Sequence, residues 1–355
     1  MFFNRPEEKF ITGNEAVVLG AIAADAKFMS GYPITPATEI LELWAKISAE
    51  KSDLKMIQSE DEISAGFNVI GAVLSGTKAF TASAGIGHVL MQDSISMAEA
   101  MRLPFVGIMM QRGGPSTGTV IYSQQEVTLA CFGGNGEGLR VVYSTSNPQE
   151  LYDYTIKAFN TAWKYRFPTF VLGDGYQSKM KIKVLLNKPK TITSSPILGQ
   201  NDRAINLRNC FNFENQLAQV LNKNIDEYQK TRSKLVEWEE YKCNDCEIVI
   251  FAHGIVSQAA KEAVDILRTK MNKKIGLFRP ITLRPFPDAP ATRIASRTQK
   301  ILIVESSFGH FSRIVKDNLY GLAKIDTLLK PVEAISSEEI IAKVNSMKSD
   351  FWTEY

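Results

Sequence analysis

Apolar and polar positions along the first 174 residues follow two periods in turn, and this alternation predicts a strict succession of strands and helices. Short apolar runs typical of buried strands stand at 27–32, 54–57, 78–83, 105–110, 139–144 and 168–174. Apolar residues at helical spacing fill the intervals 12–26, 35–47, 60–74, 89–101, 122–132 and 147–165. This order predicts a parallel sheet with helices on both faces, in which ligands bind at the carboxyl ends of the strands.

Three of the predicted helices carry signals at their first turn. Thr12 opens a capping box ahead of the first helix. Thr35 is expected as the N-cap of the second helix, with Pro36 at its first helical position. Ser59 and Glu62 also fit a capping box, which would explain both residues without any catalytic role.

The alternation stops at Lys179, where a polar segment rich in Pro and Ser is typical of a connector. A long charged helix is predicted over 213–241. Further buried strands are predicted at 247–254, 273–280 and 300–306, and further helices at 256–269, 289–297 and 336–347, the last with a capping box of Ser336 and Glu339. We therefore predict a first domain at 1–185, a linker and long helix at 186–243, and a smaller second α/β domain at 244–355.

Charge and hydropathy narrow the classes of function. The 355 residues include 41 basic and 38 acidic side chains without a basic block, so we expect no nucleic-acid partner. No apolar run reaches the roughly 18 residues that a membrane span needs, and the first ten residues lack the apolar core of a signal peptide. We expect a cytoplasmic protein without a membrane partner.

Cysteines and histidines give little support for a metal site. Cys243 and Cys246 form a CxxC pair, which could be half of a zinc site or a redox pair, but no second pair of ligands accompanies it. The three histidines, His88, His253 and His310, lack ligand spacing and are expected to be structural or surface residues. We predict no metal ion bound by this chain alone.

Two segments could carry chemistry. Glu62 is followed nine residues later by Gly71, with small residues between, a spacing characteristic of thiamine diphosphate enzymes; the capping box stays open as the alternative. In QRGGPSTG, residues 111–118, two glycines allow a ligand to approach the backbone, and Arg112 offers a planar fork suited to a carboxylate or phosphate. The alternative for this second segment is a tight turn with one solvated arginine.

Together these segments resemble a known family. GYPITPATEI, EDEISAGFNVIGA, FTASAGIGHVLMQDSISMAEAMRLP and QRGGPSTG, in this order, resemble the alpha subunit of the 2-oxoacid:ferredoxin oxidoreductases, and GLFRPITLRPFP with IVESSFGHFSRIV extends the match over nearly the whole chain. The resemblance implies an α/β fold with a parallel-sheet domain that binds the pyrimidine of thiamine diphosphate, followed by a smaller α/β domain like the C-terminal domain of transketolase.

The resemblance also implies partners. A separate beta subunit would hold the diphosphate, its Mg²⁺ and an iron–sulfur cluster. Gamma and delta subunits and ferredoxin are further expected partners, since this chain lacks cluster-type cysteine patterns.

Residue roles follow from the same resemblance. Glu62 falls on the glutamate that activates the aminopyrimidine, Thr35 on the threonine that meets the substrate carboxylate, and Arg112 on the arginine that pairs with it. The expected cofactor-binding residues are Glu62, Pro33, Ile34 and Ser83, and the expected substrate-binding residues are Thr35, Arg112, Gly113, Gly114, Ser116 and Thr117. Two prolines would hold Thr35 at a fixed distance from the reacting centre.

The implied reaction is the oxidative decarboxylation of a 2-oxoacid with coenzyme A, which gives acyl-CoA, CO₂ and reduced ferredoxin. The wording GGPSTG favours 2-oxoglutarate over pyruvate by resemblance. Two alternatives stay open, namely a thiamine-dependent decarboxylase or transketolase-like half without ferredoxin, and a non-catalytic structural subunit.

Two details qualify the match. GDG at 173–175 precedes Asn201 at an interval close to the Mg²⁺–diphosphate signature of thiamine enzymes. That signature needs a helix and a strand in the interval, where no helical period is seen, so Asp174 is expected merely to end a strand. The turn FGGNGEG, residues 132–138, replaces an HGD turn found in many relatives and weakens any substrate assignment based on it.

Overall fold

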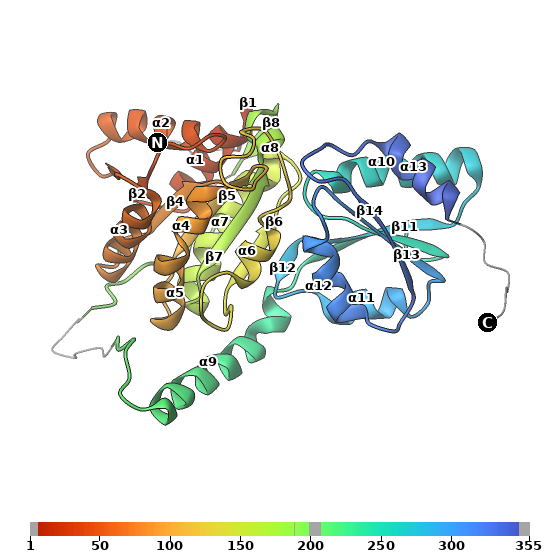
Figure 1. Cartoon of the computed structure of the whole chain (residues 1–355). Helices are drawn as coiled ribbons and strands as arrows, with labels where there is room; N and C mark the ends of the chain where they lie inside the picture. Colours follow the sequence, from red (N-terminus) through yellow and green to blue (C-terminus); the bar gives the residue numbers. More distant parts are fainter. Residues whose placement is uncertain (1–5, 188, 199–206, 348–355) are drawn as a thin grey trace.

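The structure is a computed structural model that describes residues 6–187, 189–198 and 207–347. Two α/β units lie side by side, and the long helix α9 (Glu214–Leu235) runs beneath the first unit toward the second (Figure 1). The first unit is built on a seven-stranded sheet and a two-stranded ribbon, and the second on a five-stranded sheet. Within the described ranges, no helix has the length and apolar character needed to cross a lipid bilayer.

The seven-stranded sheet is parallel apart from one edge. Its strands are β2 (Phe28–Gly31), β3 (Lys55–Gln58), β4 (Ala79–Ser83), β5 (Val106–Gln111), β6 (Val141–Ser144), β7 (Thr169–Asp174) and β12 (Thr282–Arg284). In space they follow the order β12, β6, β7, β5, β4, β2, β3, and β12 pairs antiparallel with β6. The predicted parallel sheet is confirmed, and its strands β4, β5 and β7 are buried at every residue, as helices on both faces require.

Helices cover both faces of this sheet. They are α1 (Gly13–Ala23), α2 (Thr38–Glu50), α3 (Glu62–Leu74), α4 (Ile86–Leu90), α5 (Gln92–Ala100), α6 (Val127–Phe132), α7 (Pro148–Tyr165) and α8 (Gly175–Lys179). On one face, α1, α2 and α7 pack around Phe80 of β4, whose ring meets Trp44 and Phe159 edge to face. On the other face, α3, α5 and α6 pack around Phe170. The capping box at Thr12 is confirmed, since its Oγ1 accepts a hydrogen bond from Glu15 N at 3.1 Å.

The predicted start of α2 is wrong by two residues. The helix begins at Thr38 with Ala37 as its N-cap, so Thr35 is not the cap and Pro36 is not the first helical residue. The carbonyl groups that an earlier start would need are bound by side chains from elsewhere. Arg112 Nη1 donates to Thr35 O at 2.9 Å, and Asn14 Nδ2 donates to Pro36 O at 2.8 Å. Tertiary hydrogen bonds thus keep this segment out of the helix.

The predicted capping box of Ser59 and Glu62 is also wrong. Helix α3 begins at Glu62 with Asp61 as its N-cap, and the Asp61 side chain accepts the capping hydrogen bond. Ser59 Oγ instead lies 2.8 Å from Ser30 Oγ on β2 and accepts from Asn68 Nδ2 at 3.2 Å. The structural explanation for the Glu62 side chain is therefore lost.

Other differences arise where long-range pairing overrides local pattern. The helix predicted over 89–101 is divided into α4 and α5, and the one predicted over 122–132 begins only at Val127. The helix predicted over 213–241 ends at Leu235, and β9 (Trp238–Tyr241) follows it and pairs antiparallel with β11. The predicted connector contains β8 (Lys181–Leu186), which forms the ribbon with β1 (Glu7–Thr12).

The second unit contains the predicted strands and two more at its edges. The strands of its sheet are β9, β10 (Ile248–Phe251), β11 (Ile275–Pro280), β13 (Lys300–Glu305) and β14 (Lys324–Leu329), in the order β14, β13, β10, β11, β9. Its helices are α10 (Val256–Met271), α11 (Asp288–Ala295), α12 (His310–Leu319) and α13 (Ser337–Ser346). The capping box of Ser336 and Glu339 is confirmed. The edge strands β9 and β14 are mostly half-buried, so they lack the apolar run that marked the three central strands.

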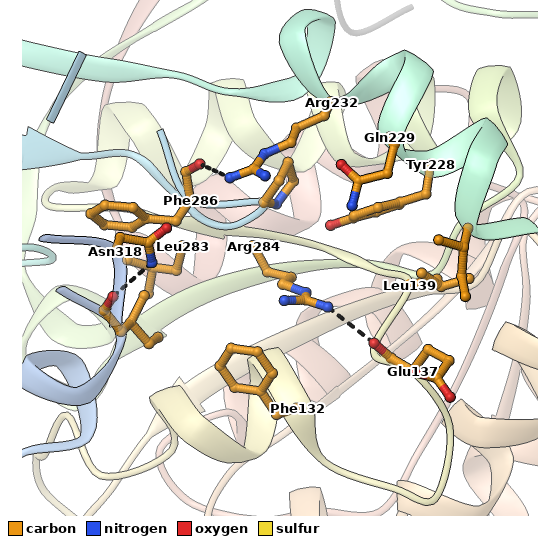
Figure 2. A pocket seen from close by; sticks show the side chains of 13 residues that line it. Phe132, Glu137, Leu139, Tyr228, Gln229, Arg232, Leu283, Arg284, Phe286 and Asn318 are labelled. Carbon is orange, nitrogen blue, oxygen red and sulfur yellow. Dashed lines mark hydrogen bonds between the residues drawn. The ribbon is translucent and has the colours of Figure 1, made fainter. Parts of the chain in front are cut away.

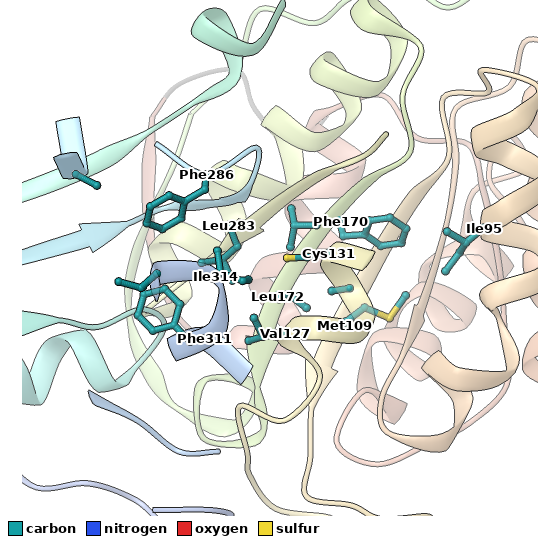
Figure 3. Packing of buried hydrophobic residues seen from close by; sticks show 14 of the residues in the cluster. Ile95, Met109, Val127, Cys131, Phe170, Leu172, Leu283, Phe286, Phe311 and Ile314 are labelled. Atoms are coloured by element: carbon teal, nitrogen blue, oxygen red, sulfur yellow. The ribbon is translucent and has the colours of Figure 1, made fainter. Parts of the chain in front are cut away.

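One hydrophobic cluster continues across both units (Figure 3). Cys131 and Leu172 of the first unit belong to the same cluster as Phe311 of the second, with Leu283 of β12 between them. Both thiols of the CxxC pair are buried in it and donate to backbone carbonyl oxygens. These contacts give the CxxC pair a packing role and hold the two units in fixed relative positions.

A buried ion pair joins the units as well. Arg279 of β11 is 2% exposed, and its guanidinium binds the Glu150 carboxylate on α7 through two hydrogen bonds, one of them 2.8 Å from Nη1 to Oε1. Burial opposes ionisation of Glu150, but the hydrogen bonds and charge of Arg279 outweigh it and lower the pKa of this carboxyl group.

Replacing Arg279 with Met leaves the Glu150 carboxylate, whose side chain is only 21% exposed, without its counter-charge. We expect the free energy of unfolding at neutral pH to fall by about 3 to 5 kcal/mol, measured by urea denaturation of the full chain. Because the pKa of Glu150 is lowered in the folded state, the contribution is lost as the pH falls through that pKa, and the gap to the wild type narrows in acid.

The matched control is Arg293→Met. It breaks an ion pair with Glu240 in which Arg293 is 58% exposed, and it should cost less than about 1 kcal/mol. Equal losses in the two variants would contradict the assigned role of the buried pair.

Candidate functional site

Four neighbouring strands end beside one another and carry the main predicted site residues. Strands β5, β4, β2 and β3 are consecutive in the seven-stranded sheet. Arg112 follows β5, Ser83 ends β4, Thr35 follows β2, and Glu62 opens the helix after β3. The structure therefore brings these residues to the carboxyl edge of a parallel sheet, which is where ligands of such folds bind.

Glu62 is a buried carboxyl group that lacks a structural purpose. Glu62 is only 4% exposed, and no described residue forms a hydrogen bond with its Oε1. Burial raises the pKa of Glu62, although a backbone hydrogen bond and the charge of Arg112 oppose this effect. An unsatisfied buried carboxyl group destabilises a fold, so its presence at a strand edge indicates a functional site.

Gly87 and Ser83 complete a small cradle around this carboxyl group. A Cβ atom on Gly87 would lie 2.3 Å from Glu62 Oε1 and 2.3 Å from Ser83 Oγ, so no side chain fits there. Ser83 Oγ is buried too and, within the described part of the chain, has no hydrogen-bond partner. The cradle thus presents one carboxyl oxygen and one hydroxyl group whose hydrogen-bonding capacity is unused.

Arg112 and Thr35 are held together at the neighbouring strand ends. Arg112 is 5% exposed, and its Nη1 donates to the Thr35 carbonyl at 2.9 Å. Its side chain crosses Gly85, where a Cβ atom would lie 2.7 Å from Arg112 Nε. Thr35 is exposed, Pro33 is half-buried and Ile34 is buried. The Thr35 backbone therefore positions the guanidinium, while the Thr35 side chain faces outward.

A cavity of about 300 Å³ opens beside Arg112. Its lining includes Arg112, Gly114, Pro115 and Ser116 of the loop after β5, Gly85, Ile86 and Val89 around α4, and Gln125, Glu126, Leu129 and His310 from elsewhere. Gln125 Oε1 accepts from Gly114 N at 2.8 Å and so fixes the loop. The predicted substrate-binding residues Gly114 and Ser116 thus share one cavity with Arg112.

The remaining two predicted loop residues lie outside the lining of that cavity. Gly113 is buried against the second unit, where a Cβ atom would lie 2.1 Å from Val332 Cγ1. Thr117 is exposed near the tip of the loop.

Sequence reasoning did not single out Glu126, and it expected His88 and His310 to be structural or surface residues. Glu126 Oε2 lies 2.8 Å from Nδ1 of the fully buried His88. His310 comes from the second unit, and its Nδ1 lies 2.8 Å from Thr128 Oγ1. Burial lowers the pKa of His310, which favours the neutral ring at pH 7. These residues reach the site through tertiary packing, so no spacing in the sequence indicated them; His253 is purely structural, fully buried and bound to Ser144 Oγ.

A second cavity of about 300 Å³ lies between α9, α6, β12 and α12 (Figure 2). Arg284 points into it, but its Nε and Nη2 donate to the carbonyl oxygens of Gly138 and Glu137. Arg232 donates to Phe286 O at 3.1 Å and pairs with Asp288. Both arginines therefore tie α9 and the 132–138 turn to β12, and this cavity is a structural junction.

The segment after GDG, residues 173–175, differs from the expectation that it contains no helix. The interval after Asp174 does contain a short helix, α8, and then β8, so the stated objection to a Mg²⁺–diphosphate signature is wrong. Asp174 does end β7 as expected, and its Oδ1 accepts capping hydrogen bonds from Tyr176 N and Gln177 N. Asn201 lies outside the described residues. Among those that are described, no group of three or more His, Cys, Asp or Glu side chains is placed to hold a metal ion.

Comparison with known proteins places the chain in a family. Residues 19–245 match the family described as pyruvate flavodoxin/ferredoxin oxidoreductase, thiamine diphosphate-binding, and residues 246–337 match pyruvate:ferredoxin oxidoreductase core domain II. The chain belongs to the 2-oxoacid:ferredoxin oxidoreductases and corresponds to their alpha subunit, as the sequence resemblance predicted.

Relatives from archaea are similar over most of their length. The subunit KorA of 2-oxoglutarate synthase from Methanocaldococcus jannaschii is 34% identical over 85% of this chain and 89% of that protein. The subunit VorB of ketoisovalerate oxidoreductase from Methanothermobacter marburgensis is also 34% identical, over 87% of this chain and 89% of that protein. The curated relatives thus include subunits named for two different substrates.

A solved structure has the same fold. The 2-oxoglutarate:ferredoxin oxidoreductase from Magnetococcus marinus, with 2-oxoglutarate, coenzyme A and succinyl-CoA bound, aligns with a TM-score of 0.84 at 24% identity. The alignment covers 95% of this chain and 65% of that chain, so this chain spans about two thirds of that longer protein. The predicted fold class is confirmed.

The raised pKa of Glu62 predicts a stability gain when its charge is removed. The folded chain binds the Glu62 proton more tightly than the unfolded chain does, so ionisation above the unfolded-state pKa destabilises the fold. The substitution Glu62→Gln introduces an amide side chain, which carries no charge at any pH. We therefore expect its melting temperature to exceed that of the wild type at pH 8, and this gap to vanish at pH 4. Glu60→Gln, at an exposed position two residues earlier, is the control and should show no such pH-dependent gap.

Proposed function

We propose that this chain is the alpha subunit of a 2-oxoacid:ferredoxin oxidoreductase that converts a 2-oxoacid and coenzyme A to acyl-CoA, CO₂ and reduced ferredoxin. The observation that carries the proposal is the Glu62 carboxyl group, buried in a cradle with Gly87 and Ser83 and lacking a partner among the described residues. The matched family model is described as thiamine diphosphate-binding, which supports this cofactor as the ligand of the cradle.

The cradle suits an aminopyrimidine ring. A carboxyl group can exchange hydrogen bonds with a ring nitrogen, and burial raises the pKa of Glu62, which favours its protonated form more than at an exposed glutamate. Ser83 Oγ offers a second polar contact, and the absent side chain at Gly87 lets the backbone of α4 lie close to both polar groups. When bound, thiamine diphosphate supplies the nucleophilic carbon and the electron sink that decarboxylation needs. Pro33 and Ile34 are proposed to flank the same ring.

Arg112 is proposed to bind the substrate carboxylate. One of its five N–H groups is used on Thr35 O, and this bond holds the guanidinium over the cavity. Thr35 is proposed to contact the same carboxylate, while Gly113, Gly114, Ser116 and Thr117 shape the loop around it. Fixed placement of the carboxylate brings the keto carbon to one position relative to the cofactor, which is the contribution that positioning makes to catalysis.

The substrate proposed is 2-oxoglutarate. The cavity beside Arg112 is also lined by the polar side chains of Gln125, Ser116 and His310. Such groups would solvate a second carboxylate, which 2-oxoglutarate has and the branched-chain oxoacids lack. The name of the KorA relative supports the same choice, and that of the VorB relative supports the branched-chain alternative.

A partner chain is proposed to cover the site. Apolar side chains are exposed on the segments that carry it, including Tyr32 at 41%, Val89 at 50% and Ile121 at 56%. Exposed apolar residues grouped at a cofactor site are typical of an interface. We assign this interface to a beta subunit that holds the diphosphate, Mg²⁺ and an iron–sulfur cluster, with gamma and delta subunits and ferredoxin as further partners. The domain bounds 1–185, 186–243 and 244–355 and the cytoplasmic location are part of the same proposal.

The experiment is an assay of the co-purified complex with a panel of oxoacids, coenzyme A and a one-electron dye. We expect dye reduction that needs both an oxoacid and coenzyme A, with 2-oxoglutarate preferred. Decarboxylation without dye reduction, in a complex free of iron–sulfur clusters, would support the thiamine-dependent decarboxylase instead. Absence of turnover with every oxoacid would support the structural subunit.

Within the same assay, Arg112→Lys should raise the KM for the oxoacid by about tenfold to 100-fold with a smaller change in kcat, because a point charge replaces a planar fork. The KM for coenzyme A should stay the same. Arg293→Lys, at an exposed position in the second unit, is the control. An unaltered KM for the oxoacid in Arg112→Lys would show that the carboxylate binds elsewhere.

A further inference from the structure

Glu126 is a buried carboxylate at the start of α6 that makes no capping bond to its own helix. It is 5% exposed, and both of its oxygens are used on other elements. Oε1 accepts from Gly85 N at 2.8 Å and from Arg112 N at 3.1 Å. Oε2 lies 2.8 Å from His88 Nδ1, which must be the donor because a carboxylate only accepts.

These three donors lie at the two halves of the proposed site. Arg112 is the proposed carboxylate anchor, and Gly85 is the residue that its side chain crosses. His88 is adjacent to Gly87 in α4, and Gly87 faces Glu62 Oε1. A single carboxylate therefore connects the strand end that carries Arg112 to the short helix that forms the cofactor cradle.

Glu126 is itself held in place by the second unit. Two residues before it, Gln124 donates through its backbone N to Ser306 O at 3.1 Å and through Nε2 to His253 O at 2.9 Å. Gln124 Oε1 accepts from Ser306 N at 2.9 Å. The segment that carries Glu126 is thus anchored to the five-stranded sheet unit through three hydrogen bonds.

We propose that Glu126, supported by His88, is a positioning residue that fixes Arg112 relative to the cofactor cradle. This inference rests on the proposed function, because it assigns to Arg112 the binding of the oxoacid. Glu126 acts through the backbone of Arg112 and through α4 and does not itself contact the reacting atoms. Its removal leaves three N–H donors without this acceptor, two of them in the buried residues Arg112 and His88, so the strand end and the α4 turn are free to move apart.

The test uses the assembled complex and the KM for 2-oxoglutarate. Glu126→Ala should raise this KM by about tenfold or more, with a smaller change in the KM for coenzyme A. Glu126→Gln should restore most of the loss, since its amide oxygen can still accept from both backbone groups and its NH₂ can donate to the other His88 tautomer. If Glu126 had only a structural role, its loss would change the KM for 2-oxoglutarate and the KM for coenzyme A to a similar degree.

Glu99→Ala is the matched control. Glu99 is also buried at 5% exposure and accepts from Arg140 Nη2 at 3.0 Å, but it belongs to α5 and lies near Gly136 of the 132–138 turn. We expect this variant to lose stability while the KM for 2-oxoglutarate stays the same. An equal rise of that KM in both variants would overturn the proposal.

A double-mutant cycle with Arg112→Lys separates this inference from the proposed function. Once the planar fork is gone, loss of Glu126 should raise the KM by less than about twofold further, because there is nothing left to position. Fully multiplicative effects would overturn the positioning role. If Arg112→Lys alone leaves the KM unaltered, the proposed function of Arg112 fails instead.

Should Glu126→Ala fail to assemble, Glu126→Asp replaces it in the cycle. The shorter side chain keeps the charge but cannot reach all three donors, so we expect a smaller rise of the KM. An unchanged KM in Glu126→Asp would overturn the proposal just as clearly.

Discussion

The arrangement of this protein depends on a carboxyl group placed where burial opposes its charge. Glu62 could have capped its own helix, but Asp61 does so, and the Glu62 side chain lies in the cradle instead. An unsatisfied buried oxygen there lowers stability. The surrounding fold offsets that cost through the fully buried central strands β4 and β5 and a hydrophobic cluster that continues through both units. The unsatisfied Glu62 oxygen thus lowers stability at one point of the sheet edge, and family membership indicates a cofactor there.

The second unit contributes to the site although the main predicted residues belong to the first. It anchors Gln124, packs Val332 against Gly113, and presents His310 to the cavity beside Arg112. The ion pair of Arg279 with Glu150 and the shared core prevent the two units from rotating against each other. A change at the interface of the units would therefore reach the substrate loop through backbone contacts.

Local periodicity was sufficient for most of the central elements. The parallel strands and both confirmed capping boxes follow from short-range pattern, because those residues are stabilised by their immediate neighbours or by burial on two faces. Edge strands such as β9 and β14 were missed because they are largely half-buried. The start of α2 was misplaced because Arg112, far along the chain, binds the Thr35 carbonyl.

The residues of the candidate site also fall into those that the sequence indicated and those that it did not. Glu62, Thr35 and Arg112 were found because they lie in motifs that the family resemblance could match residue by residue. Glu126 lies outside those motifs, whereas His88 and His310 lie within matched motifs but were expected to be structural or surface residues. The packing of α4, α6 and α12 brings all three to the site. Residues that position others through tertiary contacts leave no spacing in the sequence from which they could be inferred.

The most direct measurement is the kcat of Glu62→Gln in the assembled complex. If this carboxyl group activates the aminopyrimidine, kcat should fall by about 100-fold or more while the complex stays assembled and keeps its cofactor content. Wild-type turnover in that variant would contradict the account, because the unsatisfied carboxyl group at the sheet edge would then have no part in the chemistry.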